Sequence, residues 1–183
     1  MDLADYLKEP VSTDRPRSSG WLVFGRLEVP SGAVLVADPV FMLQSAPIEV
    51  GAGSFLVEIA LSDFGGRRLV SRLRASREPG GLLGDNVQRF IVDSQRVGLA
   101  DVDLFVAETE PLDDAGYDAF LATPPAEDVL AGQLHAEGPA PVVFAATGFG
   151  SGAYLIRELV LNGERVGIQV DFANLDLDDP SEG

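Results

Sequence analysis

Hydrophobic and polar residues alternate along two neighbouring stretches of the chain, residues 54–63 and 67–77. One face of the first stretch carries Phe55, Val57, Ile59 and Leu61, and its other face carries Ser54, Glu58 and Ser62. In the second stretch the polar face is a row of arginines, Arg68, Arg72 and Arg74. A period of two is typical of β-strands with one buried face. Since Phe64-Gly65-Gly66 lies between them, we predict an antiparallel hairpin in which Glu58 pairs with the arginine row.

A second hairpin is predicted at Asn162-Gly163, the strongest two-residue turn signal in the chain. Counting outward from this turn, Leu159 lies opposite Val166. Leu155 then lies opposite Val170, and both pairs point their side chains to the same face. This register gathers the apolar side chains on one side of the hairpin, with a single arginine as the exception.

Short apolar runs predict further strands, at residues 21–24, 33–37, 88–93, 95–99, 103–107 and 142–145. Residues 2–8 predict one short helix that ends before Pro10. Two segments, Thr109-Glu110-Pro111 and Thr123-Pro124-Pro125, have the capping threonine and early proline of a helix start. We therefore predict one or two short helices inserted around residues 110–135, the second of them over residues 129–134.

Strands precede and follow this helical insertion, without the strand–helix alternation that a parallel sheet requires. The predicted fold is mainly β, an antiparallel β-sandwich or an open barrel. We expect three parts along the chain. They are an N-terminal short helix and loop arm over residues 1–20, a single β-rich domain over residues 21–173, and an acidic, flexible tail over residues 174–183.

The composition excludes several chemistries. The 183 residues include 13 Lys and Arg against 29 Asp and Glu, a net charge of −16, so we expect no nucleic acid partner. Cysteine is absent, which excludes disulfides, thiolate nucleophiles and thiolate zinc sites. His135 is the only histidine, so a metal site built on several histidines is excluded. A Ser–His–Asp triad would have to use His135, and no serine signature lies near it.

The charge is unevenly distributed. No lysine or arginine lies between Arg96 and Arg157, whereas this interval holds Asp101, Asp103, Glu108, Glu110, Asp113, Asp114, Asp118, Glu127, Asp128 and Glu137. Such an acidic surface keeps a protein soluble or steers a basic partner. The leading hypothesis is a non-catalytic interaction domain that binds and masks a basic protein partner, as immunity or antitoxin proteins do. An accessory domain of a larger assembly fits the same composition, and the oligomeric state stays open.

The first eight residues lack the basic start and apolar run of a signal peptide. No apolar stretch approaches the ~20 residues that a membrane helix needs. We therefore expect no membrane partner and a cytoplasmic location.

Three glycines alternate in the segment Gly148-Phe149-Gly150-Ser151-Gly152. A phosphate cradle needs its glycines between a strand and a helix. Here the second hairpin follows instead, so we predict a bend between two strands. The candidate binding residues of this segment are Gly148, Gly150, Ser151, Gly152 and Tyr154.

Aspartates at predicted strand ends are the other candidates: Asp38, Asp93, Asp101 and Asp171. Paired carboxylates exchange protons or hold a hard cation, but aspartate is also an ordinary turn residue. The alternative function is therefore a carboxylate-based enzyme or ligand-binding domain that uses a divalent cation, and no other cofactor is expected. The three arginines of the row either bind an anion or an acidic partner, or form a strand face exposed to solvent. We prefer the second interpretation.

Several short motifs lie in an order that matches one known family. A glycine and an "lPSG" turn before a strand ending in "DP" correspond to Gly25, Val29-Pro30-Ser31-Gly32 and Asp38-Pro39. A "GxYpV" strand start corresponds to residues 53–57, with Phe55 in place of tyrosine. A "VDaGtg…D" segment corresponds to residues 92–101, and a closing "vvfssGwGdGxYptYwG…tDF" to residues 142–172. With these motifs the chain resembles domain-of-unknown-function family 4241, a family of uncharacterised bacterial proteins.

The resemblance implies an architecture and candidate positions but no established reaction. Besides Phe55, three departures fall in its motifs. Ser151 stands where the family has aspartate, Ser94 replaces an alanine, and residues 155–158 replace the polar-aromatic "ptYwG" piece. If the family carries a site at these positions, this chain has lost or altered it.

Overall fold

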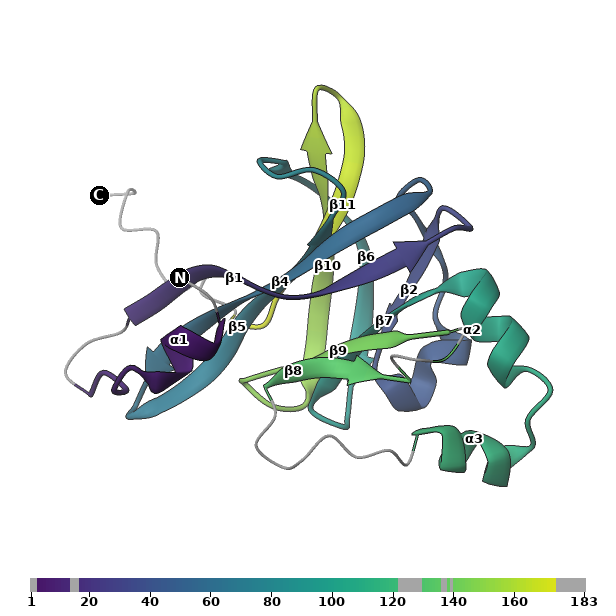
Figure 1. Ribbon diagram of the computed structural model, residues 1–183, viewed down its shortest axis with the longest axis horizontal. Helices are drawn as coiled ribbons and strands as arrows, with labels where there is room; N and C mark the ends of the chain where they lie inside the picture. Colours follow the sequence, from purple (N-terminus) through teal and green to yellow (C-terminus); the bar gives the residue numbers. More distant parts are fainter. Residues whose placement is uncertain (1–2, 14–16, 122–129, 136–137, 139, 174–183) are drawn as a thin grey trace.

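The computed structural model describes residues 3–13, 17–121, 130–135, 138 and 140–173, and within them the chain forms two antiparallel sheets (Figure 1). The larger sheet has the order β1-β4-β5-β11-β10-β6 and the smaller β3-β2-β7-β9-β8. The two sheets are open and form no closed barrel in the described part of the chain. The predicted mainly β, antiparallel fold with a few short helices is confirmed. The predicted tail, residues 174–183, lies outside the described residues.

The strands of the larger sheet are β1 (Arg17–Val29), β4 (Gly53–Phe64), β5 (Arg67–Ser76), β6 (Leu82–Val92), β10 (Gly152–Leu161) and β11 (Glu164–Asp171). Those of the smaller sheet are β2 (Ala33–Ala37), β3 (Ile48–Glu49), β7 (Arg96–Asp101), β8 (Ala131–Leu134) and β9 (Val142–Ala146). The helices are α1 (Leu3–Lys8), the 3-10 helix η1 (Pro39–Gln44), α2 (Val102–Thr109) and α3 (Asp114–Leu121). None of the described helices is long and apolar enough to cross a membrane.

The three central strands of the smaller sheet, β2, β7 and β9, are buried on both faces. Val34 and Val36 of β2 belong to the core between the two sheets, whereas Leu35 and Ala37 belong to a second core. This second core also contains Met42 of η1, Phe105 of α2 and, at its edge, Tyr117 and Phe120 of α3. A strand that is covered on both sides needs an unbroken apolar run rather than an alternating one. The molecule therefore has three layers: the larger sheet, the smaller sheet and the helices η1, α2 and α3.

The first predicted hairpin is confirmed as β4 and β5. Its turn residues Gly65 and Gly66 both have positive φ, 57° and 74°, as the favoured two-residue hairpin turn requires. Glu58 lies opposite Arg74, and the Glu58 Oε2 to Arg74 Nε distance is 2.6 Å. The expected cross-strand ion pair is therefore present.

The second hairpin forms at the predicted turn, but its predicted register is wrong beyond the first pairs. Leu159 lies opposite Gly167 instead of Val166, because the ladder shifts by one residue next to Val160. One extra residue in a strand moves every later side chain to the other face. Within β10 the buried side changes between Leu159 and Ile156, where the pairing of β10 with β6 also shifts, so Leu155, which we predicted to be buried, is 44% exposed and Ile156 is buried.

Two predictions, one of a strand and one of a helix, are wrong. Residues 103–107, predicted to continue the sheet, lie in α2, which begins directly after Asp101. Residues 131–134, predicted as part of a second helix, form strand β8, in which Leu134 pairs with Val142 of β9. In both places a tertiary partner overrides a weak local pattern. The predicted helix-start signal at residues 123–125 lies outside the described residues.

The N-terminal helix is fastened to the larger sheet by a buried ion pair. Arg68 contacts the carboxylate of Asp63 with two nitrogens, at 2.8 Å and 3.1 Å. Its third nitrogen donates to the backbone carbonyls of Tyr6 (2.8 Å) and Glu9 (3.1 Å). The guanidinium also lies over the Tyr6 ring, 4.5 Å from its centroid, and Asp63 accepts from the Ser12 N–H at 2.9 Å. This cluster therefore holds α1 and the following arm against the β4–β5 hairpin.

The predicted arginine row is divided by the fold. Arg68 belongs to the ion-pair cluster, whereas Arg72 and Arg74 lie over the ring of Trp21, 5.0 Å and 4.2 Å from its centroid. Trp21 belongs to β1, which begins at Arg17, four residues before the predicted strand start. Cation–π contact with a partly buried tryptophan thus accounts for two of the three arginines.

Replacing Asp63 with asparagine should lower the free energy of unfolding by about 3 kcal/mol, because Arg68 then stays buried without its counter-charge. The hydrogen bond from Arg68 lowers the pKa of Asp63, so the folded protein binds fewer protons there than the unfolded chain. The difference between the wild type and D63N should be fully present above pH of about 4 and disappear as pH falls through the lowered pKa.

Urea unfolding from pH 2 to pH 7 measures this difference. The matched control is Asp5→Asn, which removes a carboxylate from the exposed ion pair with Lys8 and should have a much smaller effect. An equal loss in both variants, or a difference that does not change with pH, would contradict the assignment.

Candidate functional site

Asp38, at the end of β2, is fully buried and joins two segments of the chain. Its Oδ1 accepts from the Val40 N–H at 3.0 Å and so caps η1. Its Oδ2 accepts from the backbone N–H groups of Asp93 (2.8 Å) and Ser94 (2.7 Å). The carboxylate therefore connects η1 to the turn between β6 and β7.

Asp101, at the end of β7, has an equivalent arrangement. Its Oδ1 accepts from the Leu104 N–H at 3.0 Å and caps α2. Its Oδ2 accepts from the Ser31 N–H at 2.9 Å and from the Ser31 hydroxyl at 2.6 Å. The carboxylate thus connects α2 to the turn between β1 and β2. Both oxygens of Asp38 and of Asp101 are engaged by protein donors, as buried carboxylates require.

The other two candidate aspartates are not part of a shared carboxylate cluster. Asp93 exposes its side chain, and its backbone carbonyl accepts from the Ser151 hydroxyl at 2.9 Å. Asp171 is half-buried on β11, opposite Arg72, and accepts from the Gln169 amide at 2.9 Å. Among the residues that the structure describes, no three His, Asp or Glu side chains form a group able to hold a metal ion.

The glycine segment carries the chain from the smaller sheet to the larger one. β9 ends at Ala146, and β10 begins at Gly152, so a strand and not a helix follows the glycines. The Gly150 carbonyl accepts from the hydroxyls of Thr147 and Tyr154, both at 2.6 Å. The predicted bend between two strands is confirmed, and the helix that a phosphate cradle requires does not follow Gly152.

Close packing explains why the segment begins with glycine. A Cβ on Gly148 would lie 2.5 Å from the Val70 carbonyl oxygen and 2.7 Å from the Val70 nitrogen. The Gly148 N–H donates to the same carbonyl at 3.1 Å. Gly152, by contrast, has no atom closer than 3.8 Å to the position of an added Cβ. Gly148 therefore permits a backbone contact with β5, and Gly152 does not face this constraint.

The structure brings seven of the nine sequence-predicted site residues to one corner of the fold. Asp38, Asp93 and Ser151 are connected there in series by hydrogen bonds. The other members are Gly148, Gly150, Gly152 and Tyr154. Asp101 lies at the opposite end of β7, and Asp171 lies on β11. The contacts at this corner are internal hydrogen bonds, and they position the turns that connect the two sheets.

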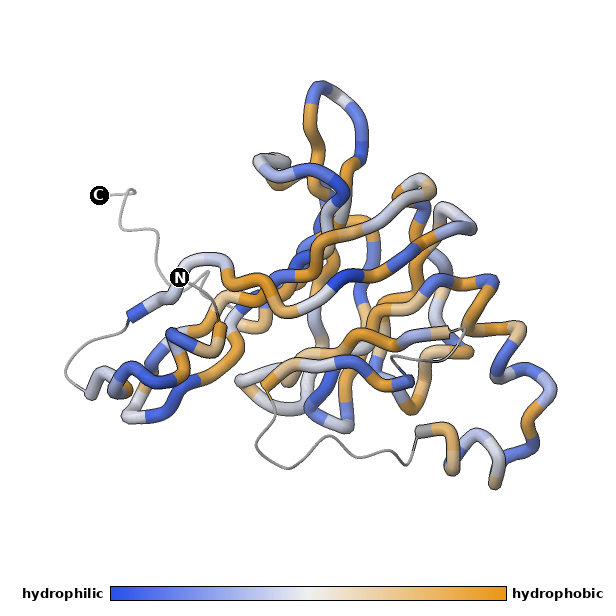
Figure 2. The backbone as a smooth tube through the Cα atoms, viewed as in Figure 1, coloured by the Kyte–Doolittle hydropathy of each residue, from blue (hydrophilic) through white to orange (hydrophobic). Residues whose placement is uncertain are grey.

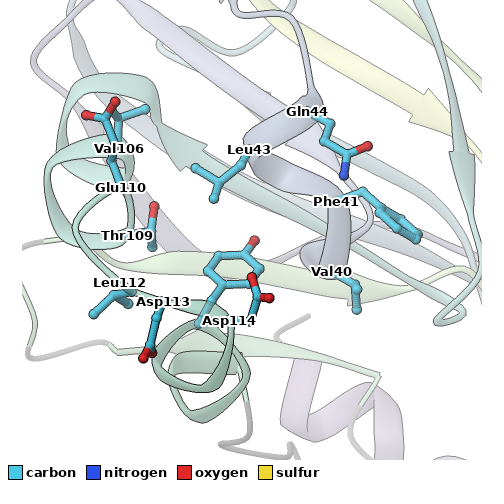
Figure 3. Close-up of a pocket in the computed structure, with 11 residues that line it drawn as sticks. Val40, Phe41, Leu43, Gln44, Val106, Thr109, Glu110, Leu112, Asp113 and Asp114 are labelled. Carbon is cyan, nitrogen blue, oxygen red and sulfur yellow. The ribbon is translucent and has the colours of Figure 1, made fainter.

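A pocket of about 530 Å³ opens on the helical layer, between η1, α2 and α3 (Figure 3). We call it the η1–α2–α3 groove. It is lined by Val40, Phe41, Leu43, Gln44, Val106, Thr109, Glu110, Leu112, Asp113, Asp114 and Tyr117. Figure 3 shows the η1 side chains Phe41, Leu43 and Gln44 across the groove from Val106 and Glu110 of α2 and its C-cap.

Several large apolar side chains around this groove are partly exposed. Val40 is 50% exposed, Leu43 45%, and Phe41 and Leu112 39% each. The hydroxyls of the lining are already used within the protein. Thr109 donates to the Phe105 carbonyl at 2.6 Å, and Tyr117 donates to the Pro39 carbonyl at 3.1 Å. Burial, and next the nearby Asp38 carboxylate, raise the pKa of Tyr117 to about 12, so this phenol stays a donor near neutral pH.

Acidic side chains surround the same groove. The exposed carboxylates of α2, α3 and the loop between them are Asp103, Glu108, Glu110, Asp113, Asp114 and Asp118. Figure 2 shows hydrophilic segments in this helical region next to the apolar strands of the smaller sheet. Asp101, which the sequence placed in the same acidic stretch, is buried and does not contribute to this surface. The positions of Glu127, Asp128 and Glu137 lie outside the described residues.

Sequence reasoning missed the groove because its lining comes from three separate segments. One local signal was available. The run Pro39-Val40-Phe41-Met42-Leu43 follows Asp38, and an aspartate before proline is a helix start. A helix that is apolar on most of its sides is normally buried, whereas Val40, Phe41 and Leu43 of η1 are partly exposed here.

Comparisons of the chain with protein-family models, with curated proteins and with solved structures found no match. The resemblance to family 4241 therefore stays a prediction.

Replacing Gly148 with alanine should lower the free energy of unfolding by about 3 kcal/mol, because the new methyl group collides with backbone atoms of β5 that cannot rotate away. The matched control is Gly152→Ala in the same segment, where an added methyl group has room and the change should stay below about 1 kcal/mol. Chemical denaturation measures both variants. Equal stabilities of the two variants would refute the close-packing explanation.

Proposed function

We propose that this protein is a non-catalytic interaction domain that binds and masks a basic protein partner, in the manner of immunity or antitoxin proteins. The observation that carries this proposal is the acidic helical surface: six exposed carboxylates on and between α2 and α3, next to a groove with exposed apolar side chains. No lysine or arginine lies in the sequence between Arg96 and Arg157.

None of the six carboxylates forms an ion pair with another described residue. In the described part of the chain, the ion pairs use Asp5, Glu9, Glu58, Asp63 and Glu158, and none uses a carboxylate of the helical surface. Like charges in one region repel one another, and a basic surface relieves that repulsion when it binds. The acidic surface also accelerates the encounter with a basic protein, and this attraction becomes weaker as the salt concentration increases.

The alternative, a carboxylate-based enzyme or binding domain with a divalent cation, has less support. Two of its four proposed ligands, Asp38 and Asp101, accept hydrogen bonds on both oxygens from backbone and serine donors. The remaining two, Asp93 and Asp171, lie on different strands or turns without a third carboxylate beside them among the described residues. This alternative, the cytoplasmic location and the absence of nucleic acid partners stay predictions.

A pull-down with paired variants tests the proposal. Asp103→Asn, Glu108→Gln and Asp118→Asn together remove three charges from the helical surface. Glu78→Gln, Asp85→Asn and Glu164→Gln together remove three charges from exposed positions elsewhere, so both triple variants have the same net charge. The immobilised proteins are exposed to a lysate of the organism that encodes them, at low and at high salt, and bound proteins are identified by mass spectrometry.

We expect the wild type and the control variant to retain the same basic protein at low salt. The helical-surface variant should bind it about tenfold more weakly, since three surface charge contacts are each worth about 0.5 kcal/mol. If no basic protein is retained at low salt, or if both triple variants lose it equally, the proposal is wrong.

A further inference from the structure

The η1–α2–α3 groove presents exposed apolar side chains that an apolar group of a partner could cover. Its apolar rim is held rigidly, because Asp38 caps η1 at one end and the Ser45 hydroxyl donates to the Val36 carbonyl at the other, at 3.2 Å. The side chain of Met42, within η1, is fully buried and so determines which side of η1 faces outward. The exposed Val40, Phe41 and Leu43 are therefore presented by a fixed element, which lowers the entropy cost of binding.

The two hydroxyls of the lining do not attract a polar ligand. Thr109 and Tyr117 donate their hydroxyl protons to carbonyls of the protein, so they offer no free donor. A polar group placed against these hydroxyls and the apolar rim would lose its water without replacement hydrogen bonds, which costs free energy. An apolar side chain pays no such cost and gains about 25 cal/mol for each Å² removed from water.

The acidic side of the groove determines what flanks that apolar side chain. Glu110, Asp113 and Asp114 line the groove together with the apolar rim. A partner segment that places a large apolar residue between Leu43 and Leu112 brings its neighbouring residues next to these carboxylates. Arginine or lysine at those neighbouring positions forms charge-assisted contacts, whereas aspartate or glutamate is repelled.

We infer that the η1–α2–α3 groove is the docking site for an amphipathic basic segment of the protein partner, whose large apolar side chain enters the groove between arginines or lysines. This inference rests on the proposed function and names the chemistry of the partner. A second copy of this chain is a poor occupant, since each copy has a net charge of −16 and the groove itself is acidic. A few well-packed residues at the centre of an interface carry most of its binding energy, and arginine and large aromatic residues are frequent among them.

Three peptide probes test the docking site. The first is an 18-residue amphipathic peptide with leucines on one side and arginines on the other. The second has serine in place of every leucine, and the third has glutamate in place of every arginine. The protein variants are Val40→Ser with Leu43→Ser in the groove, and Val23→Ser with Leu82→Ser as the control, which changes two exposed apolar residues outside it. Calorimetry at low salt measures each dissociation constant, and circular dichroism verifies that the variants are folded.

We expect the wild type to bind the leucine–arginine peptide at least tenfold more tightly than the serine–arginine peptide, and not to bind the glutamate peptide. The groove variant should lose this tenfold preference and bind the serine–arginine peptide as the wild type does. The control variant should behave as the wild type does.

The outcomes separate the two proposals. If the groove variant binds the leucine–arginine peptide as tightly as the wild type, the docking site is wrong, even when arginine-dependent binding persists. If neither arginine peptide binds at low salt, the acidic surface does not recognise basic segments, and the proposed function fails together with the docking site.

Discussion

Two buried carboxylates determine how the layers of this protein are joined. β2 and β7 are antiparallel neighbours in the smaller sheet, so Asp38 at the end of β2 and Asp101 at the end of β7 lie at opposite ends of the same strand pair. Each uses one oxygen to begin a helix and the other to hold a turn that connects the two sheets. The cost of burying a charge is offset in each case by donors from distant parts of the chain.

The position of the groove follows from these two carboxylates. Asp38 is the N-cap of η1, and Asp101 is the N-cap of α2. Two of the three helices that form the groove therefore begin directly after a strand of the smaller sheet. The third wall, α3, is held by its aromatic residues, because Phe120 stacks on His135 with 3.9 Å between ring centroids and packs edge-on against Phe105. His135, the single histidine of the chain, directly follows β8 and packs against Phe120, so it holds α3 next to the end of β8.

The sequence predicted the fold wherever the pattern was local and repeated. Alternation over residues 54–63 and 67–77, together with a two-glycine turn, was sufficient for the first hairpin, and Asn162-Gly163 for the second. It failed where one residue or a remote partner decides the outcome: the shift beside Val160, the pairing of β8, and the cap of α2. Asp38 and Asp101 were predicted as candidate carboxylates of a binding site, but their partners are 55 and 70 residues away, so the sequence did not reveal that they join distant segments. The groove combines three segments, and no single stretch of sequence contains its pattern.

The attachment of α1 has a consequence for biosynthesis. Arg68 donates to the Tyr6 carbonyl across a separation of 62 residues, and Asp63, the ion-pair partner of Arg68, belongs to the same hairpin. The ribosome therefore delivers the N-terminal helix long before the side chains that receive it. During translation, α1 cannot dock until the β4–β5 hairpin has also been made, so the first residues of the chain reach their final contacts only after about 76 residues have been synthesised.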